Sequence, residues 1–288
     1  MKPADAPLRP AGVVAAPVVG LRGAVVTRQD DWLVEEVPIA LVFNGISHAV
    51  MLATATDLED FALGFGLSEG FLLNPGELFG VDVAQAEGGI EVQMEVAAAC
   101  EMRLKSRRRT LAGRTGCGLC GAESLTQVHH PLPIAPNISV RPSAIAKAQR
   151  ALRDQQAIQQ WTGAAHAAAW CGFDGDVRLA REDVGRHNAL DKLIGAMRRA
   201  DVNASDGFVC VTSRASFEMV QKTAMCGAGL LAAVSAPTSM AVATAEACNL
   251  TLVGFVREDD LVAYTFAERV GLSATDEHSS SRGADDGR

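Results

Sequence analysis

Two cysteines separated by two residues have the clearest capacity for chemistry, and they lie in the segment Gly116-Cys117-Gly118-Leu119-Cys120-Gly121. The three glycines free the backbone, so this segment can form a loop that delivers sulfur into another protein's pocket. The thiolate is the attacking form of cysteine, and nearby positive charge lowers the pKa of a thiol. The basic residues between Lys105 and Arg114 could therefore activate Cys117 if the fold keeps them close, and they could also receive a phosphate.

Three other roles remain open for this cysteine pair. A structural zinc site usually needs four ligands, whereas the other candidate ligands are scattered: Cys100, Cys171, Cys226, His129 and His130. A thioredoxin-like site places its cysteines at a helix N-terminus, which glycines on both sides disfavour. Two buried structural thiols would be unusual in a glycine-rich loop flanked by arginines. We therefore expect a reactive pair and no bound metal.

A second polar segment, Arg181-Glu182-Asp183-Val184-Gly185-Arg186-His187-Asn188, directly precedes an amphipathic pattern of helical period. Side chains at this density, including Arg186 and His187, could bind a polar ligand or position a proton carrier. A helix start with a solvated first turn explains the pattern equally well. The sequence alone leaves both interpretations open.

A third segment, Thr212-Ser213-Arg214-Ala215-Ser216, follows a predicted central strand and precedes a helix. Ligands of open α/β sheets bind outside such strand ends, and a helix N-terminus offers free amides to an anion. Ser213 and Arg214 are therefore candidates for binding a nucleotide phosphate. The commoner use of Ser213 or Ser216 would be as a helix N-cap.

Composition narrows the class of protein. The 288 residues carry a net charge of -8, which argues against a molecule whose overall field attracts nucleic acid or anionic membrane. No apolar run reaches the roughly 18 residues of a membrane span, and no export signal is evident. Seven cysteines, an odd number, do not suggest a disulfide framework. We expect a cytoplasmic protein with reduced thiols.

The first half of the chain shows mainly strand patterns. Residues 1–20 are rich in Ala and Pro and are expected to be a disordered tail, and residues 21–138 to form a β-rich region with one helix and the cysteine loop. Alternating residues on both sides of Asn44-Gly45 predict a β-hairpin. Thr56-Asp57-Leu58-Glu59 matches a capping box, so a helix should run from there to about Phe71.

The second half predicts an α/β domain over residues 139–272, followed by a disordered tail over 273–288. Helical patterns begin at Pro142, near Leu190, at Phe217 and at Thr238. Strand patterns lie at 208–212, 232–235 and 250–256. Strands that alternate with helices predict a parallel or mixed sheet.

With these segments assembled, the chain resembles the FdhD family, the formate dehydrogenase accessory sulfurtransferases. The resemblance covers about residues 34–268 and rests on the following motifs: Glu35 to Leu41, Asp57 to Phe61, Ser68-Glu69-Gly70, Cys117 to Gly121, Thr162-Gly163 with His166, Glu182 to Lys192, and Ser213-Arg214. So many matches in order are far more specific than any single motif.

The resemblance implies a sulfur carrier that takes persulfide sulfur from a cysteine desulfurase and passes it to the molybdenum bis-guanine-dinucleotide cofactor before formate dehydrogenase receives that cofactor. Cys117 would bear the persulfide, with Cys120 as its partner. The implied cofactor-binding stretch is Phe255-Val256-Arg257-Glu258-Asp259-Asp260, although its acidic run matches a phosphate poorly. Ser213 and Arg214 would hold a guanine nucleotide phosphate, and Arg186 and His187 would line the pocket. The family also implies a homodimer.

The resemblance further implies an α/β fold of the cytidine deaminase-like, three-layer type with a smaller β-rich N-terminal domain. Zinc deaminases use a His-x-Glu motif and a Pro-Cys-x-x-Cys pair. Here His166 is followed by Ala167-Ala168, and Gly116 precedes Cys117, so deaminase chemistry is disfavoured. The main alternative function is a non-enzymatic chaperone of the molybdenum cofactor.

Overall fold

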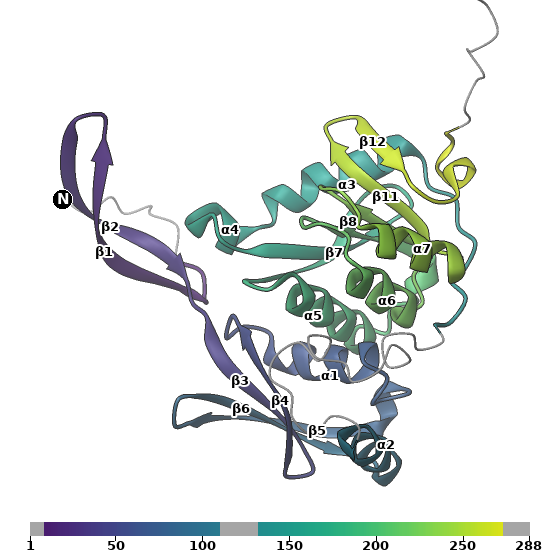
Figure 1. Ribbon diagram of the computed structural model, residues 1–288, viewed down its shortest axis with the longest axis horizontal. Coiled ribbons are helices and arrows are strands. Elements are labelled where there is room, and N and C mark those ends of the chain that lie inside the picture. Colours follow the sequence, from purple (N-terminus) through teal and green to yellow (C-terminus); the bar gives the residue numbers. More distant parts are fainter. Residues whose placement is uncertain (1–8, 110–131, 273–288) are drawn as a thin grey trace, which may run out of the picture.

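The computed structural model describes residues 9–109 and 132–272, which form three β-sheets with associated helices (Figure 1). A two-stranded arm comes first in the chain. A four-stranded sheet with helix α1 follows, and a six-stranded sheet with helices on both faces completes the fold. The described residues also include the short 3-10 helices η1 (Pro75–Glu77), η3 (Ala204–Asp206) and η4 (Ala267–Val270).

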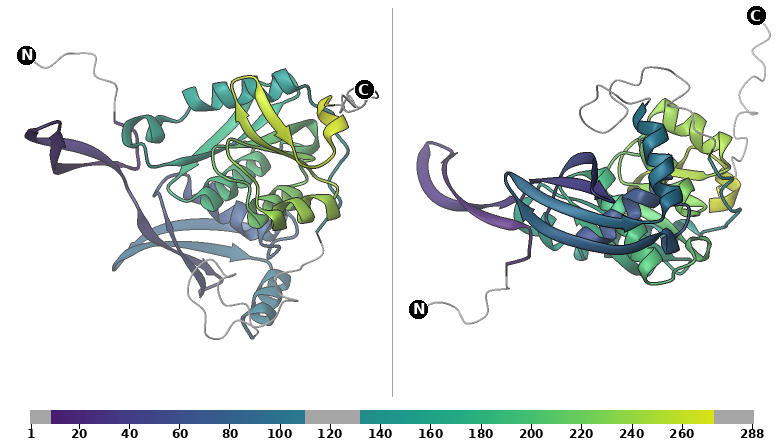
Figure 2. Two further views of the ribbon diagram at one scale, coloured as in Figure 1. Left: turned by 45° about the horizontal axis from the view of Figure 1, so that its top comes forward. Right: turned by 90° about the horizontal axis from the view of Figure 1, so that it is seen from below.

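Strands β1 (Val13–Arg22) and β2 (Val25–Val34) pair antiparallel and project from the body as an arm (Figures 1 and 2). The base of the arm packs on helix α4 (Ala157–Thr162), where the ring centroids of Trp32 and Trp161 are 4.9 Å apart. The prediction of a disordered tail up to residue 20 is therefore wrong from residue 13 onward. Valines with small residues between them satisfy strand geometry, and Pro17, which has no N–H to donate, is tolerated because both strands of a two-stranded ribbon are edge strands.

The four-stranded sheet has the order β4-β3-β6-β5, with β3 (Val37–Phe43), β4 (Ile46–Ala53), β5 (Leu78–Ala86) and β6 (Gly89–Val96). The predicted hairpin is confirmed, because Asn44 and Gly45 connect β3 to β4 with φ values of 45° and 76°. Alternate residues of β3 and β6 form a core with helix α1 (Leu58–Ser68) on one face of the sheet. The other face carries no helix in the described part of the chain.

Two local predictions in this half are wrong. Helix α1 begins after Asp57, whose φ is 51° and whose side chain makes no capping hydrogen bond, so Thr56 and Glu59 do not form a capping box. Glu59 instead pairs with Arg199 at 2.7 Å, a tertiary contact that local sequence does not reveal. One helix was expected in residues 21–138, but a second α-helix, α2 (Ala98–Arg109), is present, and the basic run beginning at Lys105 starts inside it.

The six-stranded sheet has the order β12-β11-β10-β9-β7-β8. Its strands are β7 (His166–Gly172), β8 (Val177–Asp183), β9 (Gly207–Val211), β10 (Leu230–Ala233), β11 (Thr251–Arg257) and β12 (Asp260–Ala263). Strands β8 to β11 run parallel, whereas β7 and β12 run antiparallel to their neighbours. The predicted mixed sheet is confirmed.

Helices cover both faces of this sheet, giving three layers (Figure 1). Helices α5 (Arg186–Arg199), α6 (Phe217–Cys226) and α7 (Ser239–Ala247) pack on one face, and α3 (Pro142–Asp154) packs on the other. The strand expected at 232–235 begins earlier, at Leu230, because Gly227 ends helix α6 with φ at 89°. The likeness to cytidine deaminases stays a prediction.

Helices α1 and α5 join the two main sheets at very close range. A Cβ atom on Gly64 would lie 1.7 Å from the carbonyl oxygen of Asp191, and one on Gly195 would lie 1.9 Å from that of Asp60. Only glycine permits this approach, so the predicted N-terminal and C-terminal regions share a tight interface.

Among residues 9–109 and 132–272, no helix is both long and apolar enough to cross a bilayer.

Candidate functional site

The predicted ligand-binding residues outside the cysteine loop converge on one edge of the six-stranded sheet. Because β8, β9 and β11 run parallel, their carboxyl ends meet there. Arg186 and His187 follow β8, Ser213 and Arg214 follow β9, and Phe255 lies near the end of β11. One strand separates β9 from β11 and another separates β8 from β9, so each gap is about 10 Å and the ends of β8 and β11 lie about 20 Å apart. A single nucleotide can span one such gap.

Two helix N-termini open at this edge. Gly185 occupies the N-cap of α5 and Ser216 that of α6, and neither makes a side-chain capping hydrogen bond. The Ser213 hydroxyl donates to the Arg214 carbonyl oxygen at 3.0 Å, so it does not act as an N-cap. First-turn amides that lack a side-chain cap, together with the helix dipoles, favour an anion in front of both helices.

Two arginines add positive charge to this edge. Arg214 is exposed, and neither it nor Arg186 has a carboxylate within ion-pair distance in the described part of the chain. The Nε atom of Arg186 is buried, and no described group accepts a hydrogen bond from it. Unpaired guanidinium groups beside free amides form a site suited to phosphate.

A histidine and a glutamate connect the two helix starts. His187 Nε2 lies 2.7 Å from Glu218 Oε2 of α6. This contact lowers the pKa of Glu218 despite its partial burial, so the carboxylate is ionised near neutral pH. Burial, with the charge of Arg186, lowers the pKa of His166 at the start of β7. His166 is therefore neutral near pH 7 and available as a hydrogen-bonding group.

The stretch from Phe255 to Asp260 turns from β11 into β12 at the same edge. Phe255 has φ at 52° and an exposed ring, whereas the side chain of Val256 is fully buried and can offer a ligand only its backbone. Arg257 and Asp260 are exposed. Two arginines of α3 form ion pairs with the acidic turn: Arg150 lies 3.1 Å from Asp259, and Arg153 lies 3.8 Å from Glu258. These exposed pairs are individually weak, but they reduce the local negative charge.

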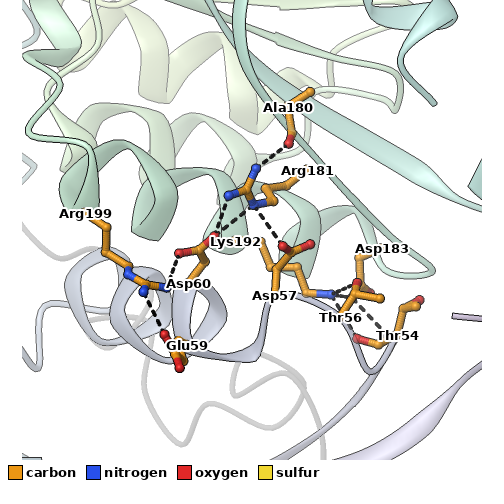
Figure 3. A network of polar contacts seen from close by, with 10 residues as sticks. All are labelled: Thr54, Thr56, Asp57, Glu59, Asp60, Ala180, Arg181, Asp183, Lys192 and Arg199. Atoms are coloured by element: carbon orange, nitrogen blue, oxygen red, sulfur yellow. Dashed lines mark hydrogen bonds and ion pairs between the residues drawn. The ribbon is translucent and has the colours of Figure 1, made fainter. Parts of the chain in front are cut away.

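Much of the motif from Glu182 to Lys192 is scaffold rather than ligand surface. Asp183 and Lys192 are fully buried and form an ion pair of 2.7 Å (Figure 3). Asp183 also accepts hydrogen bonds from the backbone amides of Thr54 and Gly185 and from Asn188 Nδ2, at 3.0, 2.8 and 3.0 Å. This network ties the end of β4 to the turn that carries Arg186 and His187.

Two further buried networks attach α1 to the sheet domain. Arg181 and Arg199 both hold the buried Asp60, at 2.7 and 3.0 Å (Figure 3). At the other end of α1, Lys222 reaches Asp191 at 3.0 Å and Glu69 at 2.7 Å. Burial opposes the charge on Lys222, but the two carboxylates raise its pKa overall.

Because Arg181 is held by Asp60, it is a structural residue and not part of the ligand-binding edge.

Sequence reasoning missed these scaffold roles and the contribution of Glu218. A usable signal was present, since Asn188, Asp191 and Lys192 lie at helical spacing of three and four residues, on the side of α5 that faces β4 and α1. Polar residues at buried positions of an amphipathic helix indicate internal pairing. No comparable local signal identifies Glu218 as the partner of His187.

Cys117, Cys120, His129 and His130 lie outside the described residues, so the predicted reactive pair stays a prediction. The other candidate zinc ligands are dispersed, because Cys100, Cys171 and Cys226 belong to three different hydrophobic cores. Burial raises the pKa of Cys226 to about 11, which makes that thiol a poor metal ligand. No group of three potential metal-binding side chains forms within residues 9–109 and 132–272.

Comparison with known proteins identifies the family. A profile of the FdhD/NarQ family matches residues 34–271. A sulfur carrier protein FdhD from Variovorax paradoxus is 58% identical, over 95% of this chain and 99% of that protein. The corresponding protein from Cupriavidus necator is 56% identical over 88% of each chain. The chain therefore belongs to the FdhD/NarQ family.

A solved structure has the same fold. The crystal structure of a candidate formate dehydrogenase accessory protein from Desulfotalea psychrophila matches with a TM-score of 0.71 and covers 90% of this chain and 99% of that one. The two sequences are 20% identical, so this likeness concerns the fold.

Proposed function

We propose that this protein is a cytoplasmic sulfurtransferase that carries sulfur as a persulfide on Cys117 and delivers it to the molybdenum bis-guanine-dinucleotide cofactor of formate dehydrogenase. The observation that supports the proposal is the edge of the six-stranded sheet, where Arg186 and Arg214 have no carboxylate partner among the described residues and lie beside two helix N-termini. A guanine nucleotide offers the phosphates that such an edge attracts. The names of the relatives support the sulfur-carrying role.

The first chemical step is an exchange at sulfur. The Cys117 thiolate attacks the outer sulfur of a persulfide on a cysteine desulfurase, the donor's S–S bond breaks, and the donor cysteine leaves as a thiolate. The new S–S bond lies on Cys117. No oxidant or reductant is consumed, since one S–S bond replaces another.

The second step turns the outer sulfur into sulfide and needs two electrons. We assign these to the cysteine pair: the Cys120 thiolate attacks the inner sulfur of the Cys117 persulfide, a Cys117–Cys120 disulfide forms, and hydrosulfide leaves toward the molybdenum. A cytoplasmic thiol reductant then restores both thiols. The cofactor serves as cargo, held through its phosphates by Arg186, Arg214 and the amides after Ser213 and Ser216, and against Phe255 and the turn to Asp260.

Sulfuration of formate dehydrogenase tests this proposal. Purified protein, a cysteine desulfurase, cysteine and the cofactor are supplied to inactive formate dehydrogenase, and its activity is followed. Wild type should activate the enzyme, Cys117→Ala should not, and Cys120→Ala should retain the persulfide without releasing it efficiently. Full activation by a variant that lacks both cysteines would instead establish the non-enzymatic chaperone. The resemblance also implies a homodimer, which this chemistry does not require.

A further inference from the structure

His166 begins strand β7 at the edge of the six-stranded sheet where β8 and β9 end. Strand β7 lies between these two strands and runs antiparallel to both, so its start coincides with their carboxyl ends. The register pairs His166 with Asp183, the last residue of β8, and Ala168 with Val211, the last residue of β9. Because neighbouring strands lie about 5 Å apart, His166 lies in the gap between the two segments that follow β8 and β9.

The imidazole ring of His166 is partly exposed, and no residue in the described part of the chain forms a hydrogen bond with it. The backbone beside it is fixed without the ring, because Ala167 N donates to Thr212 Oγ1 at 2.9 Å and Thr212 N donates to the Ala167 carbonyl oxygen at 3.0 Å. The other histidine of this edge is already engaged, since His187 Nε2 lies 2.7 Å from Glu218. The ring nitrogens of His166 are therefore available to a ligand.

The groups around His166 keep its ring neutral in the absence of a ligand. Burial, followed by the charge of Arg186, lowers the pKa of His166, and His187 acts in the same direction. Asp183 acts in the opposite direction, but Lys192 lies 2.7 Å from it and compensates its charge. A phosphate beside Arg186 would cancel the positive charge that opposes protonation of His166. The arginine that attracts the phosphate thus links phosphate binding to the charge of this histidine.

We propose that His166 is an additional ligand-binding residue of this edge, and that binding of a phosphate is coupled to the uptake of a proton by its imidazole. This inference rests on the nucleotide-binding edge of the proposed function and adds a residue and a proton to it. The proton comes from solvent, and the resulting imidazolium N–H donates a charge-assisted hydrogen bond to a phosphate oxygen. Binding therefore strengthens as the pH falls below neutral.

Calorimetric titration with GDP-mannose tests the coupling. The diphosphate of this probe is esterified at both ends, as in a dinucleotide, so its own charge does not change near neutral pH. Titrations of the wild type at about pH 6.5, in buffers that differ in ionisation enthalpy, should show uptake of more than about half a proton for each ligand bound. The affinity of the wild type should rise about 10-fold from about pH 8 to about pH 6.

Two variants locate the proton. His166→Gln keeps a hydrogen-bonding side chain that cannot be charged, so proton uptake and the pH dependence should be lost, and the affinity at about pH 6 should fall about 10-fold. His187→Gln is the matched control, because it removes the other histidine of the edge and should retain the proton uptake. Circular dichroism checks that each variant is folded.

NMR of the wild type tests the same point without a substitution, since the midpoint of the His166 titration should rise by about one pH unit or more when GDP-mannose is added. The inference is overturned if His166→Gln takes up as much proton as the wild type, if His187→Gln alone abolishes the uptake, or if the midpoint does not move. Proton-independent binding that Arg214→Gln still weakens would overturn only the role of His166. Absence of GDP-mannose and GDP binding to the wild type would overturn the nucleotide-binding edge itself, and this inference with it.

Discussion

Replacement of Lys192 by Met should destabilise this fold far more than loss of an ordinary ion pair. The side chains of Lys192 and Asp183 are fully buried, 2.7 Å apart, at the junction of β4, β8 and α5. Methionine has nearly the volume of lysine, so the change adds little cavity or strain. It leaves the Asp183 carboxylate buried with its three N–H donors but without its counter-charge.

Removing one member of a buried ion pair costs about 3–5 kcal/mol, so the free energy of unfolding of Lys192→Met should fall by that amount. Urea unfolding followed by circular dichroism measures it. Lys147→Met is the matched control, since Lys147 pairs with Asp176 at 2.6 Å but both side chains are about half exposed. That change should cost under about 1 kcal/mol.

A second substitution tests whether the loss of stability comes from the unpaired negative charge of Asp183. Asp183→Asn added to Lys192→Met removes the negative charge while keeping an oxygen acceptor, so at least about 1 kcal/mol should be recovered. The reasoning is refuted if Lys192→Met is no more costly than Lys147→Met, or if the double variant is less stable than Lys192→Met alone.

Three further predictions follow from the packing and the site. Gly64→Ala should cost more than about 3 kcal/mol or prevent folding, because its Cβ would lie 1.7 Å from the Asp191 oxygen, whereas Gly20→Ala, with 3.7 Å to Thr27, should be nearly neutral by urea unfolding. The fold lowers the pKa of His166. The stability that comes from its neutral form is therefore complete above the unfolded pKa, about 6.5, and is lost as the pH falls from there toward the folded pKa. His166→Gln should flatten the dependence of the free energy of unfolding on pH in that window. Arg214→Gln should weaken GDP binding about 10-fold to 100-fold in calorimetry without changing the free energy of unfolding. The control is Arg178→Gln, at the opposite end of β8, which should leave GDP binding unchanged. Equal GDP affinity in these two variants would show that Arg214 is not part of the site.

Local sequence patterns predicted much of the fold because they reflect local physics. Asn44-Gly45 forms its hairpin since both residues tolerate positive φ, and the strands after residue 207 were recognisable because β9 and β10 are short apolar runs buried on both faces. The capping box failed because Asp57, with φ at 51°, occupies the N-cap, while Glu59 pairs with Arg199, 140 positions along the chain. The arm was missed because Ala and Pro near the terminus resemble a disordered tail, while its strand pairing depends on residues up to Val34.

The candidate site was predictable in part. Arg186, His187, Ser213 and Arg214 stand directly after strands, and parallel strands end at a common edge, so their convergence follows from the fold. The scaffold pairs could not be assigned, because Asp183 meets Lys192 only after α5 packs on β8, and Lys222 meets Glu69 only after α1 packs on α6. A motif dense in polar residues therefore mixed ligand-facing side chains with buried ones.

The most direct test of the central claim is intact-protein mass spectrometry after incubation with a cysteine desulfurase and cysteine, followed by peptide mapping. Sulfur carriage on Cys117 predicts an added mass of one sulfur atom that maps to Cys117, disappears on treatment with a reductant, and is absent from Cys117→Ala. Absence of added sulfur from both Cys117 and Cys120, with an active desulfurase, would contradict the account.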